Sequence, residues 1–235
     1  MDNSLFWSLI AGACTALGAG MLFLKKNWSN RGLGFFLGLA SGVMVAVVAF
    51  DMLPSALLFP GYPKALVGFA SGMVLLWLVD YFVFDHAQGK ESLLGLGYLI
   101  MLGIALHDLP EGMAIALGGE MKDRTGMVIA LAIGIHNIPE GMAIAAPLIM
   151  GGMKRISIIL KVSLLGLITP LGTVVGLAAV SIVPGLLPFL LGFASGIMIY
   201  LVIYQLWPQA GRKDLKTRRW GFWLGMIIIL AATFI

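Results

Sequence analysis

Two closely similar stretches carry most of the residues in this chain that are able to do chemistry. The first is "ALHDLPEGMAIAL" from Ala105, and the second is "GIHNIPEGMAIAA" from Gly134. Each supplies an imidazole, a neighbouring carboxylate or amide, and a glutamate. The six residues are His107, Asp108, Glu111, His136, Asn137 and Glu140. Nitrogen and oxygen donors without a thiolate suit Zn²⁺, Fe²⁺, Mn²⁺, Co²⁺ or Cd²⁺ better than Cu⁺.

The spacing places these donors on one side of a helix. At about 3.6 residues per turn, His107 and Glu111 share a face as an i, i+4 pair, and Asp108 lies about 100° further round. The second stretch repeats this layout, so two facing helices would offer a mixed imidazole and carboxylate site. Its glutamates would be placed to bridge an adjacent subsite. Pro110 and Pro139 each remove a helix hydrogen bond, which frees a carbonyl at the same depth.

The chain around these stretches is that of a membrane protein. Of its 235 residues, 60% are hydrophobic and 11% are charged, which excludes an ordinary soluble domain. Apolar segments of about 20 residues are long enough to span a bilayer. We therefore predict an all-α integral membrane protein, a single polytopic domain over 1–235, with eight transmembrane helices. Their spans are 4–24, 34–58, 65–85, 93–118, 127–150, 158–181, 186–208 and 219–235.

The basic residues predict the orientation of this bundle. Of the fifteen Lys and Arg residues, twelve fall in connectors predicted inside or in the span ends next to them, and only Lys64, Lys122 and Arg124 fall outside. This bias places both termini outside. The net charge of +4 is thus a signal of topology, and no nucleic-acid partner is predicted. The single cysteine, Cys14, excludes a disulfide framework and a thiolate metal site.

An internal repeat relates the two ends of the chain. "LGLASGVMVAVVAFDMLPSA" from Leu37 matches "LGFASGIMIYLVIYQLWPQA" from Leu191, at an offset of 154. The same offset aligns "GACTALG" from Gly12 with "GLITPLG" from Gly166. The first three helices are therefore predicted to be an inverted copy of the last three, with the middle two as a second inverted pair. This inverted 3+2+3 arrangement is typical of secondary transporters, whose binding site lies near the bilayer midplane.

The duplicated acids fall near the centre of their helices. An acid at that depth costs roughly 2.5 to 3.5 kcal/mol on an insertion scale, and the predicted helix cores hold no Lys or Arg to neutralise Asp108, Glu111 and Glu140. A divalent cation is the natural counter-charge. The alternative is that these residues only bond one helix to another. Met44 and Met198, equivalent under the repeat, are expected to pack rather than to bind copper.

These motifs resemble the ZIP (Zrt/Irt-like) divalent metal transporters, in particular their bacterial GufA- and ZupT-like branch. The resemblance rests on "HDLPEG" and "HNIPEG" and on the eight-helix plan, and it covers the whole chain. It implies a primary metal site made of His107, Glu111, His136 and Glu140, with Asp108 and Asn137 joining the glutamates at an adjacent site.

The resemblance also implies what the protein does and where it works. The expected substrate is Zn²⁺ or a similar divalent cation, moved toward the cytoplasm across the bacterial inner membrane, with no catalytic cofactor. The partners are then the metal ion and the lipid bilayer, and a homodimer is left open. The alternatives are an intramembrane metallohydrolase, for which "HEXXH" is absent, and a membrane metal sensor that binds without flux.

The chain departs from the family pattern at Thr169 in "ITPLG", where relatives usually carry a glutamate that completes the second subsite. A hydroxyl offers only a neutral oxygen, so a single-metal site is predicted. Gln205 stands where many relatives carry an acid.

Four further polar residues have open roles. Asp85 and His86 form either a weak inner-face metal site or a solvated pair. Asp80 lines the inner exit or makes a packing contact. Asp51, near the outer membrane boundary, is expected to attract cations at the entrance, and the alternative is an interfacial acid that ends its helix.

Overall fold

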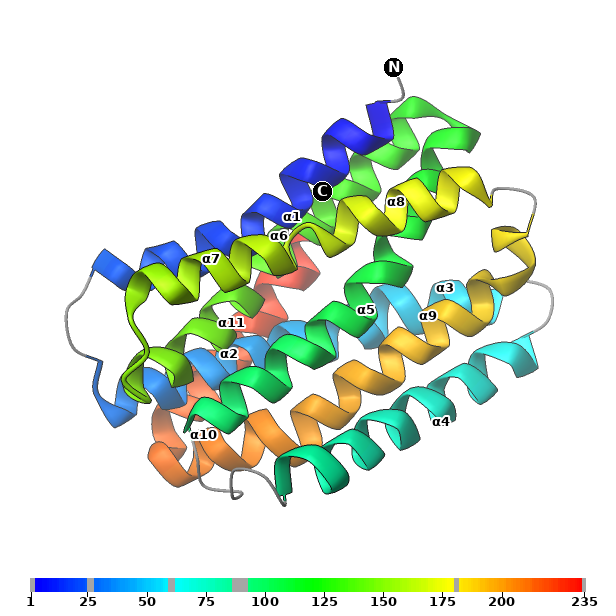
Figure 1. Cartoon of the computed structure of the whole chain (residues 1–235). Helices are drawn as coiled ribbons and strands as arrows, with labels where there is room; N and C mark the ends of the chain where they lie inside the picture. Colours follow the sequence, from blue (N-terminus) through cyan, green and yellow to red (C-terminus); the bar gives the residue numbers. More distant parts are fainter. Residues whose placement is uncertain (1–2, 25–27, 59–61, 86–92, 180–181, 234–235) are drawn as a thin grey trace.

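The protein is all-helical wherever the structure describes it. The computed structural model describes residues 3–24, 28–58, 62–85, 93–179 and 182–233. Long helices run side by side along one direction (Figure 1). Their bounds are α1 Asn3–Met21, α2 Asn30–Val47, α3 Leu53–Leu58, α4 Tyr62–Val79, α5 Leu93–Met121, α6 Asp123–Met150, α7 Arg155–Leu165, α8 Ile168–Ala178, α9 Val183–Tyr200, α10 Trp207–Lys213 and α11 Leu215–Thr233.

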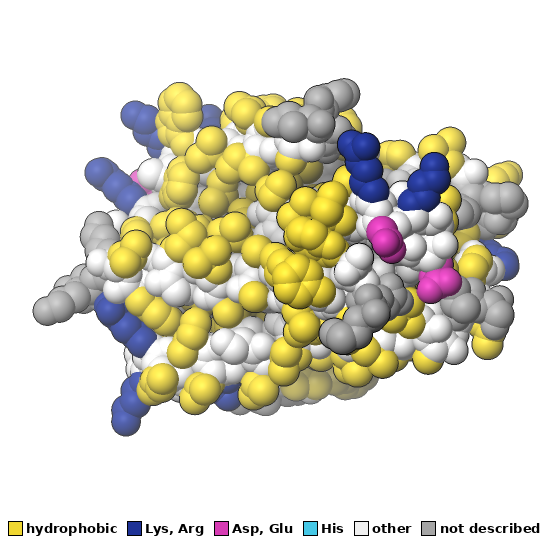
Figure 2. Space-filling model, turned by 90° about the horizontal axis from the view of Figure 1, so that it is seen from above, with side chains coloured by type: hydrophobic (Ala, Val, Ile, Leu, Met, Phe, Trp, Pro, Cys, Tyr) yellow, Lys and Arg dark blue, Asp and Glu magenta, His cyan; other side chains and the backbone are white. Residues whose placement is uncertain are grey.

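Within the described residues, seven helical spans are long and apolar enough to cross a membrane. They are Asn3–Leu24, Asn30–Leu58, Tyr62–Val83, Leu93–Met121, Asp123–Met150, Arg155–Ala178 and Val183–Lys213. Hydrophobic side chains cover much of the surface between the ends of the molecule, and Lys and Arg side chains gather toward the ends (Figure 2). The structure is therefore that of a multi-pass membrane protein.

The eighth predicted span corresponds to α11 and differs from the other seven. Lys216, Arg218 and Arg219 all fall in its first two turns. These charges shorten its apolar part, which begins at Trp220. The helix still packs closely along α2, so its apolar part belongs to the bundle.

A side-chain cap explains where α11 begins. The backbone N–H of Thr217 donates to Asp214 Oδ1 at 2.7 Å, as the first turn of a helix requires. This hydrogen bond, together with the one from the Thr217 hydroxyl and the nearby charge of Arg31, lowers the pKa of the Asp214 carboxyl. The chain therefore turns back sharply between α10 and α11.

The helices pack as two groups. In the first group, α6 packs against α1 and α5, and α5 also packs against α8. In the second group, α2 packs against α11, and α4 packs against α9. Contacts of α5 with α9 and of α2 with α6 join the groups. Both stretches with chemistry-bearing residues lie in the first group, on α5 and α6.

Glycines bring neighbouring helices into direct backbone contact. At each of these positions a Cβ would collide with the backbone of the facing helix, so only glycine permits the observed approach. The glycines and the residues they face are Gly12 with Gly166, Gly18 with Ile138, Gly172 with Leu109, Gly141 with Thr15, Gly112 with Thr169, Gly38 with Arg218, Gly192 with Ala65, Gly42 with Phe222, Gly196 with Phe69, Gly68 with Phe189, Gly221 with Phe35, Gly72 with Phe193 and Gly225 with Leu39.

Two long helices contain a π-helical turn immediately before a proline. In η2 (Val48–Met52) the N–H of Leu53 reaches back to the carbonyl of Val48, and in η4 (Leu201–Leu206) the N–H of Trp207 reaches the carbonyl of Val202. The prolines that follow, Pro54 and Pro208, lack the N–H that would continue the regular ladder. A third π-helical turn, η3 (Asp80–Asp85), ends the α4 span.

Candidate metal site

The two duplicated stretches face each other, and their histidines and glutamates pair crosswise between helices. His107 Nε2 on α5 lies 3.4 Å from Glu140 Oε1 on α6. His136 Nε2 on α6 lies 3.2 Å from Glu111 Oε2 on α5. The histidine and glutamate of each stretch therefore point toward the other helix, as their i, i+4 spacing predicts. Each imidazole, however, lies next to the glutamate of the opposite helix and not next to the one on its own helix.

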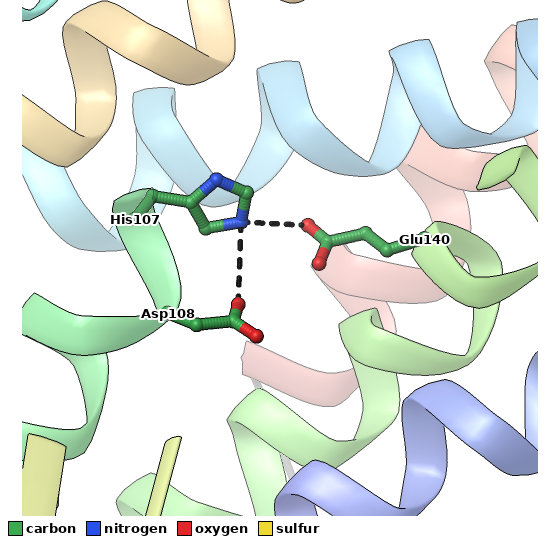
Figure 3. A group of neighbouring side chains, drawn as sticks. All are labelled: His107, Asp108 and Glu140. Atoms are coloured by element: carbon green, nitrogen blue, oxygen red, sulfur yellow. Dashed lines mark ion pairs between the residues drawn. The ribbon is translucent and has the colours of Figure 1, made fainter. Parts of the chain in front are cut away.

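Asp108 joins the first of these pairs. Its Oδ1 lies 3.6 Å from His107 Nε2, and one ligand atom from each of His107, Asp108 and Glu140 lies within 4.8 Å of the other two. The three side chains converge on a common point (Figure 3). Donors about 2.1 Å from a tetrahedral zinc lie about 3.4 Å apart, so these separations suit one ion.

The ligand candidates are buried and incompletely satisfied. All six are at most 3% exposed. Several polar atoms have no hydrogen-bond partner among the described residues: His107 Nε2, both carboxylate oxygens of Asp108 and of Glu140, Glu111 Oε1 and Asn137 Oδ1. Buried polar atoms are normally paired, and a buried charge without a partner is strongly unfavourable. A cation among His107, Asp108 and Glu140 would satisfy the unpaired atoms of those three side chains.

The ring of His107 is oriented by its own helix. Its Nδ1 lies 3.0 Å from the carbonyl oxygen of Gly103, one turn earlier. Because that carbonyl can only accept, the neutral ring carries its proton on Nδ1, and its Nε2 lone pair then faces Asp108 and Glu140, where a metal ion would bind. Such a hydrogen bond behind a metal-binding histidine selects the tautomer that binds metal.

Asn137 and Asp108 differ in their surroundings despite their equivalent places in the two stretches. The amide nitrogen of Asn137 donates to the carbonyl of Ala11 on α1, at 3.0 Å. Asn137 is therefore anchored toward α1, whereas Asp108 turns toward His107. The sequence alone predicted an adjacent site shared by both residues, and the structure brings only Asp108 into the compact group.

A cavity of about 390 Å³ leads to the second pair. It reaches Glu111 and His136, and Asp51 lies on its wall. The rest of its lining is mainly apolar and comes from α2, α5, α6, α9 and α11. Met121 and Thr125, at the turn between α5 and α6, also line it. The cavity thus connects Glu111 and His136 with the turn between α5 and α6, which is predicted to lie on the outer side of the membrane.

Asp80 makes a packing contact between helices. Its Oδ2 accepts a hydrogen bond from Tyr200 Oη at 2.8 Å and another from Gln205 Nε2 at 2.6 Å. Gln205 stands where many relatives carry an acid, and here its side-chain amide donates a hydrogen bond to Asp80. The part played by Tyr200 had no sequence signal. His86 lies outside the described residues, as does the side chain of Asp85.

Thr169 on α8 packs against α5 next to the site. Its side chain is fully buried, and its hydroxyl has no hydrogen-bond partner among the described residues. Its carbonyl lies against Gly112, which follows Glu111. The neighbouring Thr173 donates to the carbonyls of Gly112 and Thr169, at 3.0 and 3.2 Å. Thr173 therefore ties α8 to α5, a contact that the sequence did not predict.

A multi-pass helical protein with imidazoles and carboxylates buried between two of its helices belongs to the class of membrane proteins that handle metal ions. The family model described as "ZIP Zinc transporter" matches residues 85–233. The chain is 33% identical over 231 residues to "Zinc transporter ZupT" of Escherichia fergusonii, covering 91% of this chain and 89% of that protein. It is also 33% identical over 228 residues to "Zinc transporter ZTP29" of Arabidopsis thaliana, covering 86% and 83%.

The chain belongs to the ZIP family. It is therefore a transporter of divalent metal and not an enzyme.

Proposed function

We propose that this protein carries Zn²⁺, and with it Fe²⁺, Mn²⁺, Co²⁺ or Cd²⁺, across the bacterial inner membrane toward the cytoplasm. The observation that carries the proposal is the crosswise pairing of two histidines with two glutamates inside the bundle. The names of the two zinc transporters that resemble the chain support zinc as the principal substrate. Soft metals such as Cu⁺ are disfavoured, because the group offers no sulfur ligand.

The proposed ligands divide by their geometry. His107, Asp108 and Glu140 hold the ion directly, since their donor atoms already have the separations of a metal site. His136 and Glu111 complete this site or hold an ion beside it, and the cavity gives them access from the outside. The side-chain oxygen Oδ1 of Asn137 is available on the α1 side of the site, either as a ligand or through a water molecule on the ion.

Asp51 is proposed to attract cations into the cavity. It is an acidic residue on the largely apolar wall, and the π-helical turn η2 presents it there. A negative charge between apolar walls concentrates cations, because field lines are focused where the dielectric constant is low. Glu111 and His136 then receive the ion.

The full membrane arrangement proposed is eight helices in an inverted 3+2+3 repeat, with α11 as the eighth and both termini outside. The glycine contacts support it, because almost every one has a counterpart in the other half. Gly18 facing Ile138 corresponds to Gly172 facing Leu109, and Gly42 facing Phe222 corresponds to Gly196 facing Phe69. The turns η2 and η4 support it too, since they occupy equivalent places in the repeat.

Zinc uptake into proteoliposomes tests the proposed site. Glu111→Ala and Glu140→Ala should each abolish uptake, because each removes a buried carboxylate from one crosswise pair. Glu120→Ala is the matched control, since Glu120 lies on α5 but is exposed. Uptake at the control rate by both buried variants would contradict the site. Tight zinc binding without uptake in the unmodified protein would favour a sensor.

A further inference from the structure

Most buried hydroxyls in this protein bond to a backbone carbonyl. Ser8 donates to Leu5, Ser41 to Leu37, Ser195 to Leu191, and Thr173 to Gly112 and Thr169. This is the ordinary way for a helix to satisfy a serine or threonine in an apolar setting. Two fully buried hydroxyls have no partner among the described residues, those of Thr15 and Thr169.

These two threonines are equivalent in the repeat and lie beside the metal site. Thr15 in "GACTALG" aligns with Thr169 in "GLITPLG". The carbonyl of Thr15 lies against Gly141, which follows Glu140, and the carbonyl of Thr169 lies against Gly112, which follows Glu111. The backbones of Thr15 and Thr169 therefore pack against α6 and α5, each next to one of the two glutamates.

Asn137 carries another buried oxygen without a partner in the described part of the chain, on a side chain that is anchored to α1 one helical turn from Thr15. Asn137 donates its amide nitrogen to the carbonyl of Ala11, one helical turn before Thr15. One turn after Asn137, Gly141 lies against the carbonyl of Thr15. The side chain of Asn137 is thus held against this part of α1, and its Oδ1, fully buried, has no partner among the described residues. We call Thr15 Oγ1 and Asn137 Oδ1 the α1 niche.

The chemistry of the α1 niche is that of a hydrogen-bond acceptor. An amide oxygen can only accept, and the threonine oxygen has lone pairs to accept with. Water bound to a divalent cation is a strong donor with two O–H groups, because the ion polarises it. Two buried acceptors beside a metal site match the two hydrogens of one such water.

We propose that Thr15 and Asn137 accept hydrogen bonds from a water molecule that stays on the transported ion, so that the ion is bound only partly dehydrated. This inference rests on the proposed function. Three donors come from His107, Asp108 and Glu140, and the water supplies a further one. Thr15 is then a positioning residue on α1, a helix that contributes no direct ligand to the compact group.

The niche also affects which metals are accepted. Zn²⁺ tolerates four-coordination, whereas Mn²⁺ prefers more oxygen ligands and keeps more of its water. Loss of the niche should therefore lower the affinity for Mn²⁺ more than the affinity for Zn²⁺. Removing a group that supports a metal ligand typically lowers affinity by about 10- to 100-fold, and we expect a loss of about 10-fold for Mn²⁺.

Thr15→Val tests the role of the hydroxyl, because valine keeps the shape and removes the oxygen. Thr15→Ser restores a hydroxyl, and Ser8→Ala is the matched control, since Ser8 is equally buried on α1 but bonds to its own helix. Binding of Mn²⁺ and Zn²⁺ to each purified protein is measured. Among the three variants, only Thr15→Val should show the fall in Mn²⁺ affinity. Equal behaviour of Thr15→Val and Ser8→Ala, or a serine variant as weak as the valine variant, would overturn the inference.

A measurement on the unmodified protein does not depend on any variant folding. Electron–nuclear double resonance of Mn²⁺ bound to the unmodified protein in D₂O should detect the deuterons of a coordinated water. Mn²⁺ bound without exchangeable deuterons would overturn the inference and leave the proposed transport intact. Failure of the unmodified protein to bind any divalent metal would overturn both.

Discussion

Replacing Thr169 by glutamate should convert a site for one tightly bound metal into a site for two. The buried acids Asp108, Glu111 and Glu140 carry three negative charges. One dication leaves this group with a net charge of −1, and a second dication would bring it to +1. A fourth carboxylate at position 169 would bring the two-metal state to neutrality.

The size of the effect follows from the position of Thr169. Its hydroxyl is buried and unpartnered, and its backbone lies against Gly112 beside Glu111. A carboxylate about 6 Å from a dication, at an effective dielectric constant of about 20, attracts it by about 5 kcal/mol. Burying the new carboxylate costs several kcal/mol. The remainder, on the order of 1 kcal/mol, corresponds to a second ion bound up to about tenfold tighter.

Calorimetric titration with zinc, supported by elemental analysis at matched free metal, measures the stoichiometry. We expect about one tight ion per chain in the unmodified protein and a value approaching two in Thr169→Glu. Thr169→Gln is the matched control, because it has nearly the same size without the charge. Two tight ions in the unmodified protein, or equal values for the glutamate and glutamine variants, would refute the charge argument.

Two further outcomes are expected. Metal affinity at fixed free zinc should fall on acidification, because His107 and His136 bind metal only when neutral and protons compete with zinc for them; affinity unchanged between pH 8 and pH 5 would show that they are not ligands. Gly12→Ala should destabilise the protein by about 1 to 3 kcal/mol, because a Cβ there collides with the carbonyl of Gly166, whereas Gly20→Ala on the same helix meets nothing. Thermal unfolding in detergent compares the two variants, and equal midpoints would contradict the packing argument.

The sequence predicted the helical segments and the site-bearing helices well, because both depend on local properties. Long apolar runs must be helical in lipid, and i, i+4 spacing alone places His107 and Glu111 on one face. Seven of the predicted spans correspond to apolar helices in the structure. The eighth stays a prediction, since three basic residues lie in the first turns of α11.

The partners across helices could not be predicted from local spacing. The crosswise pairing depends on the vertical register of α5 against α6, and the anchoring of Asn137 depends on how closely α1 approaches. Both are determined by glycine contacts such as that of Gly141 with Thr15. The hydrogen bond of Tyr200 to Asp80 likewise joins helices far apart in the chain. The assignment of the six ligand residues stays a prediction.

The contact between Gly12 and Gly166 bears on the ancestry of the molecule. Each of these glycines lies against the other, and in the proposed repeat they are one position seen twice. A residue that meets its own copy must sit on the twofold axis of an isologous pair. Two identical three-helix chains would form a dimer with this contact. Any substitution in such a chain would then appear on both sides of the twofold axis. Because one polypeptide carries all of these helices, each member of an equivalent pair can vary on its own, as the middle pair does with aspartate at 108 and asparagine at 137.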